Sequence, residues 1–271
     1  MKLKKSGMVI IIIVCVLLVW IALHISLHSR AIVKPYAIAH RGGAGLAPEN
    51  TLAAISESIS MGIKIVEVDL QRTSDGVLIL LHDRNVERTT NGSGYISELT
   101  WEEVSQLDAG SYYSERFVDE SIPALYSVLE IITDNNITLF LEVKNPSDYP
   151  GIENQILDTL NEYEAKKNVV ILSFDHKWLK TLQKAASETR IGLLSYWKGR
   201  MPSTSTANYL GIHWAAVVFD PTIVLRAHKA GLDVFVWSVN SRLGMKIMYW
   251  LGADGIVTDR PDLLLEIINS T

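Results

Sequence analysis

Polar side chains that could do chemistry follow several apolar runs of this 271-residue chain. Glu67 and Asp69 lie two positions apart in the run IVEVD, and Glu142 follows the run TLFL. Side chains two apart on a strand share one face, so these two carboxylates would repel each other unless a cation lay between them. Glu142 could complete a set of three, and all-oxygen ligation suits Mg²⁺, Ca²⁺ or Mn²⁺. The spacing favours a divalent cation site over a surface pair with ordinary salt bridges.

Two histidines, His40 and His82, each end an apolar run, AIAH and VLILLH. Histidine titrates near neutral pH, so a pair can act as general base and general acid. A single histidine at the end of a strand is more often structural, but a pair beside three carboxylates favours catalysis. Which of the two is the acid does not follow from the sequence.

Two cationic residues, Arg41 and Lys144, follow the same apolar runs. A guanidinium fork and a compact ammonium both suit phosphate oxygens, although each could instead neutralise the neighbouring carboxylates. Glu49 and Asn50 stand where the first helix is expected to begin. They could cap that helix, fix the loop after the first histidine or contact the metal site, and the sequence favours neither a structural nor a functional role.

The elements that must position these groups alternate along the chain. Strands are expected at 36–40, 64–72, 77–82, 138–144, 168–174, 190–196, 215–219, 232–239 and 255–258. Amphipathic helices are expected at 49–61, 123–135, 151–166, 176–188, 221–230, 241–251 and 261–269. Strands that are apolar on both faces and separated by helices indicate a parallel sheet covered by helices. Polar groups end strands throughout the chain, which favours a (β/α)₈ TIM barrel of roughly 250 residues over a doubly wound sheet with one switch point.

One stretch, residues 84–121, interrupts the alternation because it is polar and contains glycine and serine. We expect a small inserted cap there, at the catalytic face of the barrel. A short helix is expected at 100–107, where Thr100 followed by Glu103 resembles a capping box. The barrel with its cap would span residues 31–271.

The N-terminal segment contains an unbroken apolar run at residues 8–23, preceded by Lys2, Lys4 and Lys5. With its flanks the run approaches the roughly 20 residues of a membrane-spanning helix. Positive charge before it predicts a cytoplasmic N-terminus and an extracytoplasmic catalytic domain. We therefore expect residues 1–30 to be a cytoplasmic stub and a single-pass anchor in the cell membrane. A cleaved signal peptide is the alternative, because its apolar core would have a similar composition.

The composition argues against a nucleic-acid-binding protein and against sites that depend on cysteine. The formal net charge of −5 argues against a nucleic-acid partner. The single cysteine, Cys15, lies inside the first apolar run, so neither a disulfide nor a cysteine metal site can form within the chain.

Five segments together resemble the glycerophosphodiester phosphodiesterase family. They are HRGGAGLAPENT, EVDLQRTSDGVLILLHD, LEVK, VFVWSVN and GADGIVTDRPDLL, and they occur in this order across residues 36–271. The resemblance implies a (β/α)₈ barrel with a cap after the His-Asp strand. It also implies metal-dependent cleavage of glycerophosphodiesters to sn-glycerol 3-phosphate and an alcohol, with one divalent cation, Ca²⁺ or Mg²⁺. Proposals for the family allow the glycerol 2-hydroxyl to attack and give a cyclic intermediate.

The resemblance assigns roles residue by residue. Trp237 would line the substrate mouth, although an aromatic strand residue is as often part of barrel packing, and Asp259 is expected to be structural and to hold the final loop. The chain departs from the family pattern at residues 195–208 and 211–214 (GIHW), which leaves the leaving-group pocket undefined. The implied roles are cation ligands for Glu67, Asp69 and Glu142, acid–base catalysis for His40 and His82, and phosphate contacts for Arg41 and Lys144.

Two alternatives differ from this interpretation. A lysophospholipase D-like enzyme would bind a substrate that carries an acyl chain. Aromatic residues of the cap could contact this chain; these are Trp101, Tyr112, Tyr113 and Phe117. A non-catalytic, membrane-anchored binding module would tend to have lost a metal ligand or a histidine, whereas here every expected polar group is present. The sequence does not decide the natural alcohol, the choice of cation or the oligomeric state.

Overall fold

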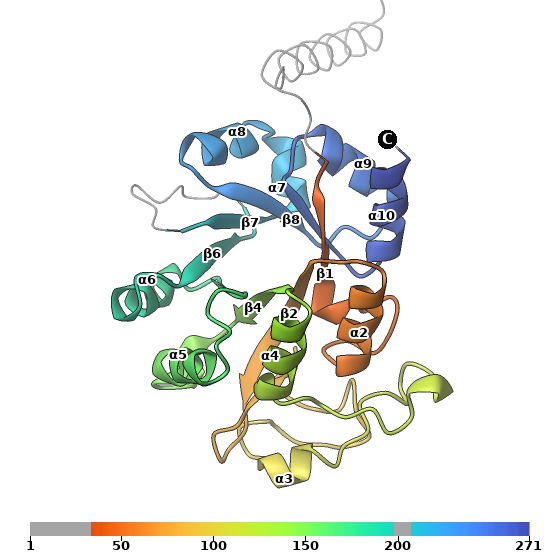
Figure 1. Cartoon of the computed structure of the whole chain (residues 1–271), viewed down its shortest axis with the longest axis vertical. Coiled ribbons are helices and arrows are strands. Elements are labelled where there is room, and N and C mark those ends of the chain that lie inside the picture. The colour runs from red at the N-terminus through yellow and green to blue at the C-terminus, as the bar shows by residue number, and fades with distance from the viewer. Residues whose placement is uncertain (1–33, 198–206, 271) are drawn as a thin grey trace, which may run out of the picture.

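The computed structural model describes residues 34–197 and 207–270, and in it eight parallel strands close into a barrel (Figure 1). The first strand pairs with the last and also with the second, so the sheet closes on itself. The predicted barrel is therefore confirmed. Its strands are β1 (Tyr36–Ala39), β2 (Ile65–Arg72), β4 (Thr138–Val143), β5 (Val169–Ser173), β6 (Arg190–Ser195), β7 (Tyr209–His213), β8 (Asp233–Trp237) and β9 (Gly255–Thr258).

Helices surround the barrel, as Figure 1 shows. Several begin at residues that favour a helix start: Asp175 and Ser241 accept hydrogen bonds from the first turns of α6 and α9, and Pro261 opens α10. The helices are α2 (Leu52–Ser60), α4 (Leu125–Asp134), α5 (Ile152–Glu162), α6 (His176–Ala185), α7 (Trp214–Phe219), α8 (Thr222–Lys229), α9 (Arg242–Trp250) and α10 (Pro261–Asn269).

Two hydrophobic layers follow from the alternation of side chains along each strand. Residues such as Val66, Val68 and Leu141 pack in the large cluster that includes the helices. The intervening positions form a separate cluster that fills the barrel, with Phe140 and Phe235 as its largest members. The interior is therefore solid, and polar groups that face inward can collect only above it, at the carboxyl ends of the strands.

The prediction that residues 77–82 form a barrel strand was wrong. Strand β3 (Leu78–Leu80) pairs antiparallel with β2 and extends the sheet outside the barrel. The connection between β2 and β3 is too short for a parallel crossover, which needs about a dozen residues or more. The turn includes Gly76, at φ 95°, a conformation that favours glycine. His82 thus reaches the site from a hairpin and not from the end of a barrel strand.

The prediction of a strand at 215–219 was also wrong. These residues belong to helix α7, and the seventh barrel strand is β7, which precedes them. His213 ends the strand and caps the helix, because its Nδ1 accepts the backbone N–H of Ala215 at 3.3 Å. A short apolar run such as AAVVF does not distinguish a buried strand from one side of a buried helix.

The polar stretch after β3 forms a lobe with its own small core. Helix α3 (Trp101–Val104) begins with the predicted capping box between Thr100 and Glu103, which is confirmed. A short 3₁₀ helix, η2 (Glu115–Phe117), follows before the chain returns to α4. Apolar side chains of the lobe, among them Val86, Ile96 and Val104, pack together apart from the two barrel clusters.

The predicted anchor lies outside the described residues. Within 34–197 and 207–270, no helix is both long enough and apolar enough to cross a membrane. The membrane segment and the side of the membrane on which the barrel lies therefore stay predictions.

Candidate active site

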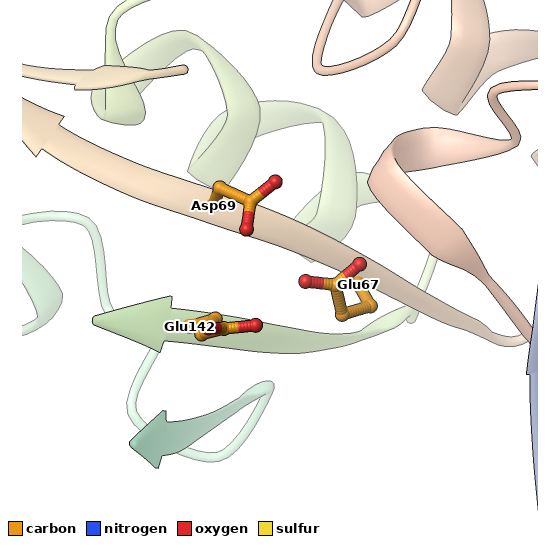
Figure 2. A group of neighbouring side chains, drawn as sticks. All are labelled: Glu67, Asp69 and Glu142. Atoms are coloured by element: carbon orange, nitrogen blue, oxygen red, sulfur yellow. The ribbon is translucent and has the colours of Figure 1, made fainter. Parts of the chain in front are cut away.

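Three carboxylates converge above the packed interior of the barrel. Glu67 and Asp69 lie on β2 and Glu142 lies on β4, where Asp69 and Glu142 are register partners. They alternate with apolar residues that pack against the helices, so their side chains face the inside of the barrel. One oxygen from each of the three lies within 4.8 Å of the others, and Figure 2 shows the side chains turned toward one another.

The electrostatics of the two glutamates is typical of a cation site. Burial raises the pKa of Glu67 to about 7 and that of Glu142 to about 8, and the charge of Asp69 adds to both shifts. In the described part of the chain, Oε1 of each glutamate is buried without a hydrogen-bond partner. Such unpartnered acceptors are costly, and a divalent cation would satisfy them because it takes carboxylate oxygens as ligands. The three residues could therefore hold a metal ion.

Asp69 differs from the two glutamates because it has cationic partners. Lys144 Nζ lies 2.9 Å from its Oδ1, and Arg41 Nε lies 3.5 Å from its Oδ2. Burial would raise the pKa of this carboxyl, but Lys144 and Arg41 outweigh burial and hold the pKa well below its usual range. Asn50 donates a hydrogen bond of 2.9 Å to Oδ2 and accepts the backbone N–H of Asp69 at 3.0 Å. Asp69 is therefore the most acidic of the three carboxyls before a cation binds.

A left-handed turn after β1 brings His40 and Arg41 to this cluster. Arg41 has φ 51° and Gly42 has φ 85°, and the backbone N–H of Arg41 donates to Glu67 Oε2 at 2.9 Å. A Cβ added at Gly42 would lie 2.9 Å from Cβ of Ala54 in α2. Glycine at this position therefore permits both the turn and the close approach of the helix.

We expect Gly42→Ala to lower the free energy of unfolding by about 2–4 kcal/mol, because the substitution adds a steric overlap to an unfavourable φ. Gly62→Ala is the matched control: Gly62 has φ 86°, but a Cβ there would meet nothing within 4 Å. The control should lose only about 1 kcal/mol. Urea denaturation of both variants measures the difference, and equal losses would show that the overlap is not the cause.

His40 is held by an aspartate from the far end of the chain. Its Nδ1 lies 2.5 Å from Oδ1 of Asp259, and its Nε2 lies 4.0 Å from Oε2 of Glu67. Burial alone would lower the pKa of His40, but the hydrogen bond with Asp259 and the charge of Glu67 raise it above its ordinary value. Asp259 also accepts from Asn240 Nδ2 at 2.5 Å. Asp259, expected to hold the final loop, therefore also orients a histidine.

His82 has the same arrangement with the residue that follows it. Its Nδ1 lies 2.5 Å from Oδ1 of Asp83, whose Oδ2 accepts from Arg88 Nε at 2.5 Å. Arg88 also binds both carboxylate oxygens of Glu49, at 2.7 and 2.9 Å. Burial lowers the pKa of His82, with Lys144 and Arg41 adding to that shift. Both histidines are thus fixed through Nδ1, and the two environments move their pKa values in opposite directions.

These groups line one pocket of about 150 Å³, together with an aromatic wall. Trp237 packs against Phe174 and Tyr196, with ring centroids 5.7 and 5.0 Å apart, so it belongs to barrel packing and lines the pocket as well. Its Nε1 is buried without a partner among the described residues and could donate to a bound molecule. The predicted site residues in the pocket wall are His40, Arg41, Glu67, His82, Glu142, Lys144 and Trp237, with Asp69 against Lys144.

Residues 40–263 match the model of the glycerophosphoryl diester phosphodiesterase family. The chain belongs to this family. Membership confirms the resemblance seen in the five sequence segments, and with it the enzyme class, a phosphoric diester hydrolase.

Relatives of known name match over nearly their whole length. A glycerophosphodiester phosphodiesterase of Caldanaerobacter subterraneus subsp. tengcongensis is 37% identical over 240 residues, which cover 87% of this chain and 98% of the relative. A phosphodiesterase of Oleispira antarctica, solved with the product sn-glycerol 3-phosphate, is 29% identical with a TM-score of 0.75 and covers 87% and 97%. A putative glycerophosphoryl diester phosphodiesterase of Silicibacter pomeroyi is 26% identical with a TM-score of 0.77, and covers 87% and 93%.

Within this member of the family, the sequence did not predict which residues hold the histidines, although Asp259 was expected to hold the final loop. Asp83 directly follows His82 in the sequence, and this adjacency could have indicated that the aspartate holds the histidine. Asp259 and His40 are 219 residues apart, and only the closed barrel, in which β1 and β9 are neighbours, brings them together. Arg88, in the lobe after β3, had no signal, because an arginine in a polar stretch is ordinarily a solvated charge.

The cap aromatics named for an acyl chain do not line the catalytic pocket of this family member. Trp101 packs within the lobe, Phe117 is buried against Ala47 and Ala54, and the Tyr112 hydroxyl accepts the backbone N–H of Glu49 at 3.0 Å. Trp101 and Phe117 therefore belong to local packing, whereas Tyr112 and Tyr113 are 43% and 37% exposed. The roles of the pocket residues in the reaction stay predictions.

Proposed function

We propose that this protein hydrolyses glycerophosphodiesters to sn-glycerol 3-phosphate and an alcohol, in a reaction that depends on one divalent cation, Ca²⁺ or Mg²⁺. The proposal rests on the side chains that meet in a single pocket. Two buried glutamates with unpartnered oxygens lie there beside two histidines, each fixed at Nδ1 by an aspartate. The product seen in the Oleispira antarctica relative supports the choice of product.

The cation would be held by Glu67, Asp69 and Glu142, whose oxygens converge from two strands. When bound, the cation would neutralise the negative charge that builds up on a nonbridging phosphate oxygen during the reaction. Arg41 and Lys144 line the same pocket and add positive charge for the other phosphate oxygens. Because both also contact Asp69, they hold their positions before substrate arrives.

The environments of the two histidines suggest which is acid and which is base. His82 has a lowered pKa, so it is neutral at neutral pH and can accept the proton of the attacking hydroxyl. His40 has a raised pKa, so it keeps its proton to higher pH than His82 does and is the better placed of the two to donate it to the leaving alkoxide. Asp83 and Asp259 hold the rings through Nδ1, which leaves Nε2 for proton transfer.

Release of glycerol 3-phosphate from glycerophosphocholine by the full chain tests the proposed function. We expect no release in the presence of a chelator, recovery when Ca²⁺ or Mg²⁺ is added in excess, and no recovery in Glu67→Ala. Glu130→Ala, which removes an exposed carboxylate on α4, should behave like the wild type. A folded protein that releases no product with either cation would refute the proposal.

The membrane location is a further part of this proposal. A lysine-flanked apolar run at residues 8–23 supports a single-pass anchor within residues 1–30, with the catalytic domain outside the cytoplasm. The membrane itself would then be a partner of the protein, through this segment. Protease treatment of intact cells, followed by detection of the barrel, tests the orientation, because a protected barrel would place it in the cytoplasm.

A further inference from the structure

The lobe after β3 reaches the residues of the catalytic pocket through Arg88. This arginine lies in a turn at residues 86–90, where the backbone N–H and the Oγ1 hydroxyl of Thr90 both donate to the carbonyl oxygen of Val86, at 3.1 and 2.7 Å. Val86 is fully buried in the lobe core, and Thr89 is buried as well. Because buried residues stand on both sides of Arg88, the backbone that carries its guanidinium is fixed to the lobe.

The guanidinium of Arg88 holds two carboxylates at once. Its Nε donates to Oδ2 of Asp83 at 2.5 Å. Its Nη1 and Nη2 donate to the two carboxylate oxygens of Glu49, at 2.9 and 2.7 Å. Such a planar fork fixes the orientation of a carboxylate as well as its distance, which the compact charge of a lysine does not.

Each of the two carboxylates continues to a different residue of the pocket. Asp83 contacts Arg88 through Oδ2 and uses Oδ1 for Nδ1 of His82, at 2.5 Å. Glu49 uses Oε1 to accept from Nη1 of Arg41 as well, at 2.8 Å. One arginine of the lobe is therefore connected to the proposed base on one side and to a proposed phosphate ligand on the other.

The orientation of His82 depends on this connection because adjacency alone does not fix Asp83. An aspartate side chain in a partly exposed loop can adopt several staggered rotamers, and only some of them turn Oδ1 toward the ring. Gln71 holds the backbone here, since its Nε2 donates to the carbonyl oxygens of His82 and Asp83, each at 3.3 Å. The bond from Arg88 selects the side-chain rotamer of Asp83.

The lobe holds Glu49 at its side chain and at its backbone. Arg88 binds both carboxylate oxygens, and the Tyr112 hydroxyl accepts the backbone N–H at 3.0 Å. The carboxylate that orients Arg41 is thus itself oriented by two residues of the lobe. A displacement of Glu49 would move the guanidinium of Arg41 away from its place in the pocket wall.

We propose that Arg88 is a positioning residue of this active site. It holds the ring of His82 through Asp83, and it holds the guanidinium of Arg41 through Glu49. This inference rests on the proposed function, in which the histidine transfers a proton and Arg41 contacts phosphate. The lobe is then a working part of the active site, because one of its side chains sets two groups that meet the substrate.

Kinetics of the full chain on glycerophosphocholine, with the better of Ca²⁺ and Mg²⁺, tests this role in Arg88→Met. We expect kcat to fall about 10–100-fold, because slight displacement of a catalytic group is costly, and KM to rise because a phosphate contact weakens. Arg84→Met is the matched control: Arg84 lies in the same lobe, its side chain is 58% exposed against 45% for Arg88, and it pairs with Asp148 outside the pocket. The control should match the wild type. Wild-type kinetics in Arg88→Met, or equal losses in both variants, would overturn the inference.

Combined variants distinguish positioning from a general effect on the lobe. Asp83→Ala/Glu49→Ala removes both partners of Arg88, so adding Arg88→Met to it should change kcat/KM by less than about twofold. In the wild-type background the same substitution should cost its full factor. If Arg88→Met costs the same factor in both backgrounds, the arginine does not act through these carboxylates and the inference is wrong.

Nitrogen NMR of the histidine-labelled full chain, with cation and without substrate, separates failure of this inference from failure of the proposed function. The ring nitrogen shifts of His82, assigned by their absence in His82→Gln, report which nitrogen carries the proton of the neutral ring. At pH 8 the wild type and Arg84→Met should carry it on Nδ1, which faces Asp83, whereas Arg88→Met should show a mixture of both tautomers. An unchanged tautomer in Arg88→Met would overturn the inference even if glycerophosphocholine is hydrolysed. A tautomer that depends on Arg88, in a folded protein that hydrolyses no glycerophosphodiester, would instead refute the proposed function.

Discussion

Glu142→Gln is expected to lower cation-dependent turnover by about 10³-fold or more and, at the same time, to stabilise the cation-free protein at alkaline pH. The loss of activity follows because an amide is a poor replacement for a carboxylate ligand, and a cation contributes several kcal/mol to stabilising charge on a phosphoryl oxygen. The gain in stability follows from the pKa of Glu142, which burial and the charge of Asp69 raise to about 8. Function and stability are thus opposed at this residue.

The sign of the pH effect can be worked out from that pKa. In the unfolded chain a glutamate titrates near 4.5, so between about pH 4.5 and pH 8 the native state binds one more proton at Glu142 than the unfolded state. Stability must therefore fall as pH rises through this range, by up to a few kcal/mol. Glu67, with a pKa of about 7, contributes in the same direction. Glutamine carries no titratable group, so the variant should lose much of this fall.

Urea denaturation in chelator at pH 5.5 and pH 8 measures the stability change, and glycerol 3-phosphate release measures the activity. We expect the wild type to lose stability between the two pH values and to regain it when cation is added at pH 8. Glu130→Gln, at an exposed position of α4, should follow the wild type in both assays. If Glu142→Gln is less stable than the wild type at pH 8 in chelator, the ionised carboxylate does not destabilise the cation-free fold, and burial of Glu142 no longer supports a cation site.

The part of this site that sequence could predict is the part governed by strand periodicity. Glu67 and Asp69 had to share a face, and a parallel barrel had to bring Glu142 to the same end of the strands. That the strand of Glu142 is the direct neighbour of β2 is known only from the structure, because the run at 77–82 forms a hairpin strand outside the barrel. Strand periodicity did not predict how the chain reaches His82. The apolar run before His82 is short enough to form either a hairpin strand outside the barrel or a barrel strand, and only the tight turn before the run distinguishes the two.

The remaining parts depend on contacts between distant segments. The bond between His40 and Asp259 exists because the first and last strands meet when the barrel closes. The start of α7 depends on the GIHW segment, whose last residue, Trp214, begins a helix and not a strand. The same segment was identified as a departure from the family pattern, so the resemblance located the unusual segment, while its geometry became known only from the fold.

His40→Gln and His82→Gln are each expected to lower kcat/KM for glycerophosphocholine by about 10²–10⁴-fold, the usual contribution of a general acid or base. In the wild type, kcat/KM should rise with pH as His82 loses its proton, at a pKa below the ordinary 6.5. It should fall again as His40 loses its proton, at a pKa above that value. Each variant should lose one limb of this bell, the acid limb in His82→Gln and the alkaline limb in His40→Gln.

A substrate with a better leaving group separates the two roles, because the p-nitrophenyl ester of glycerol 3-phosphate releases an anion that needs no proton. If His40 is the general acid, His40→Gln should regain most of its lost activity on this ester, while His82→Gln should stay impaired because the attacking hydroxyl must still be deprotonated. Recovery in His82→Gln instead would exchange the two roles. His228→Gln, on α8 and outside the pocket, should match the wild type on both substrates. Equal impairment of both pocket variants on both substrates would mean that these histidines orient or bind and do not transfer protons.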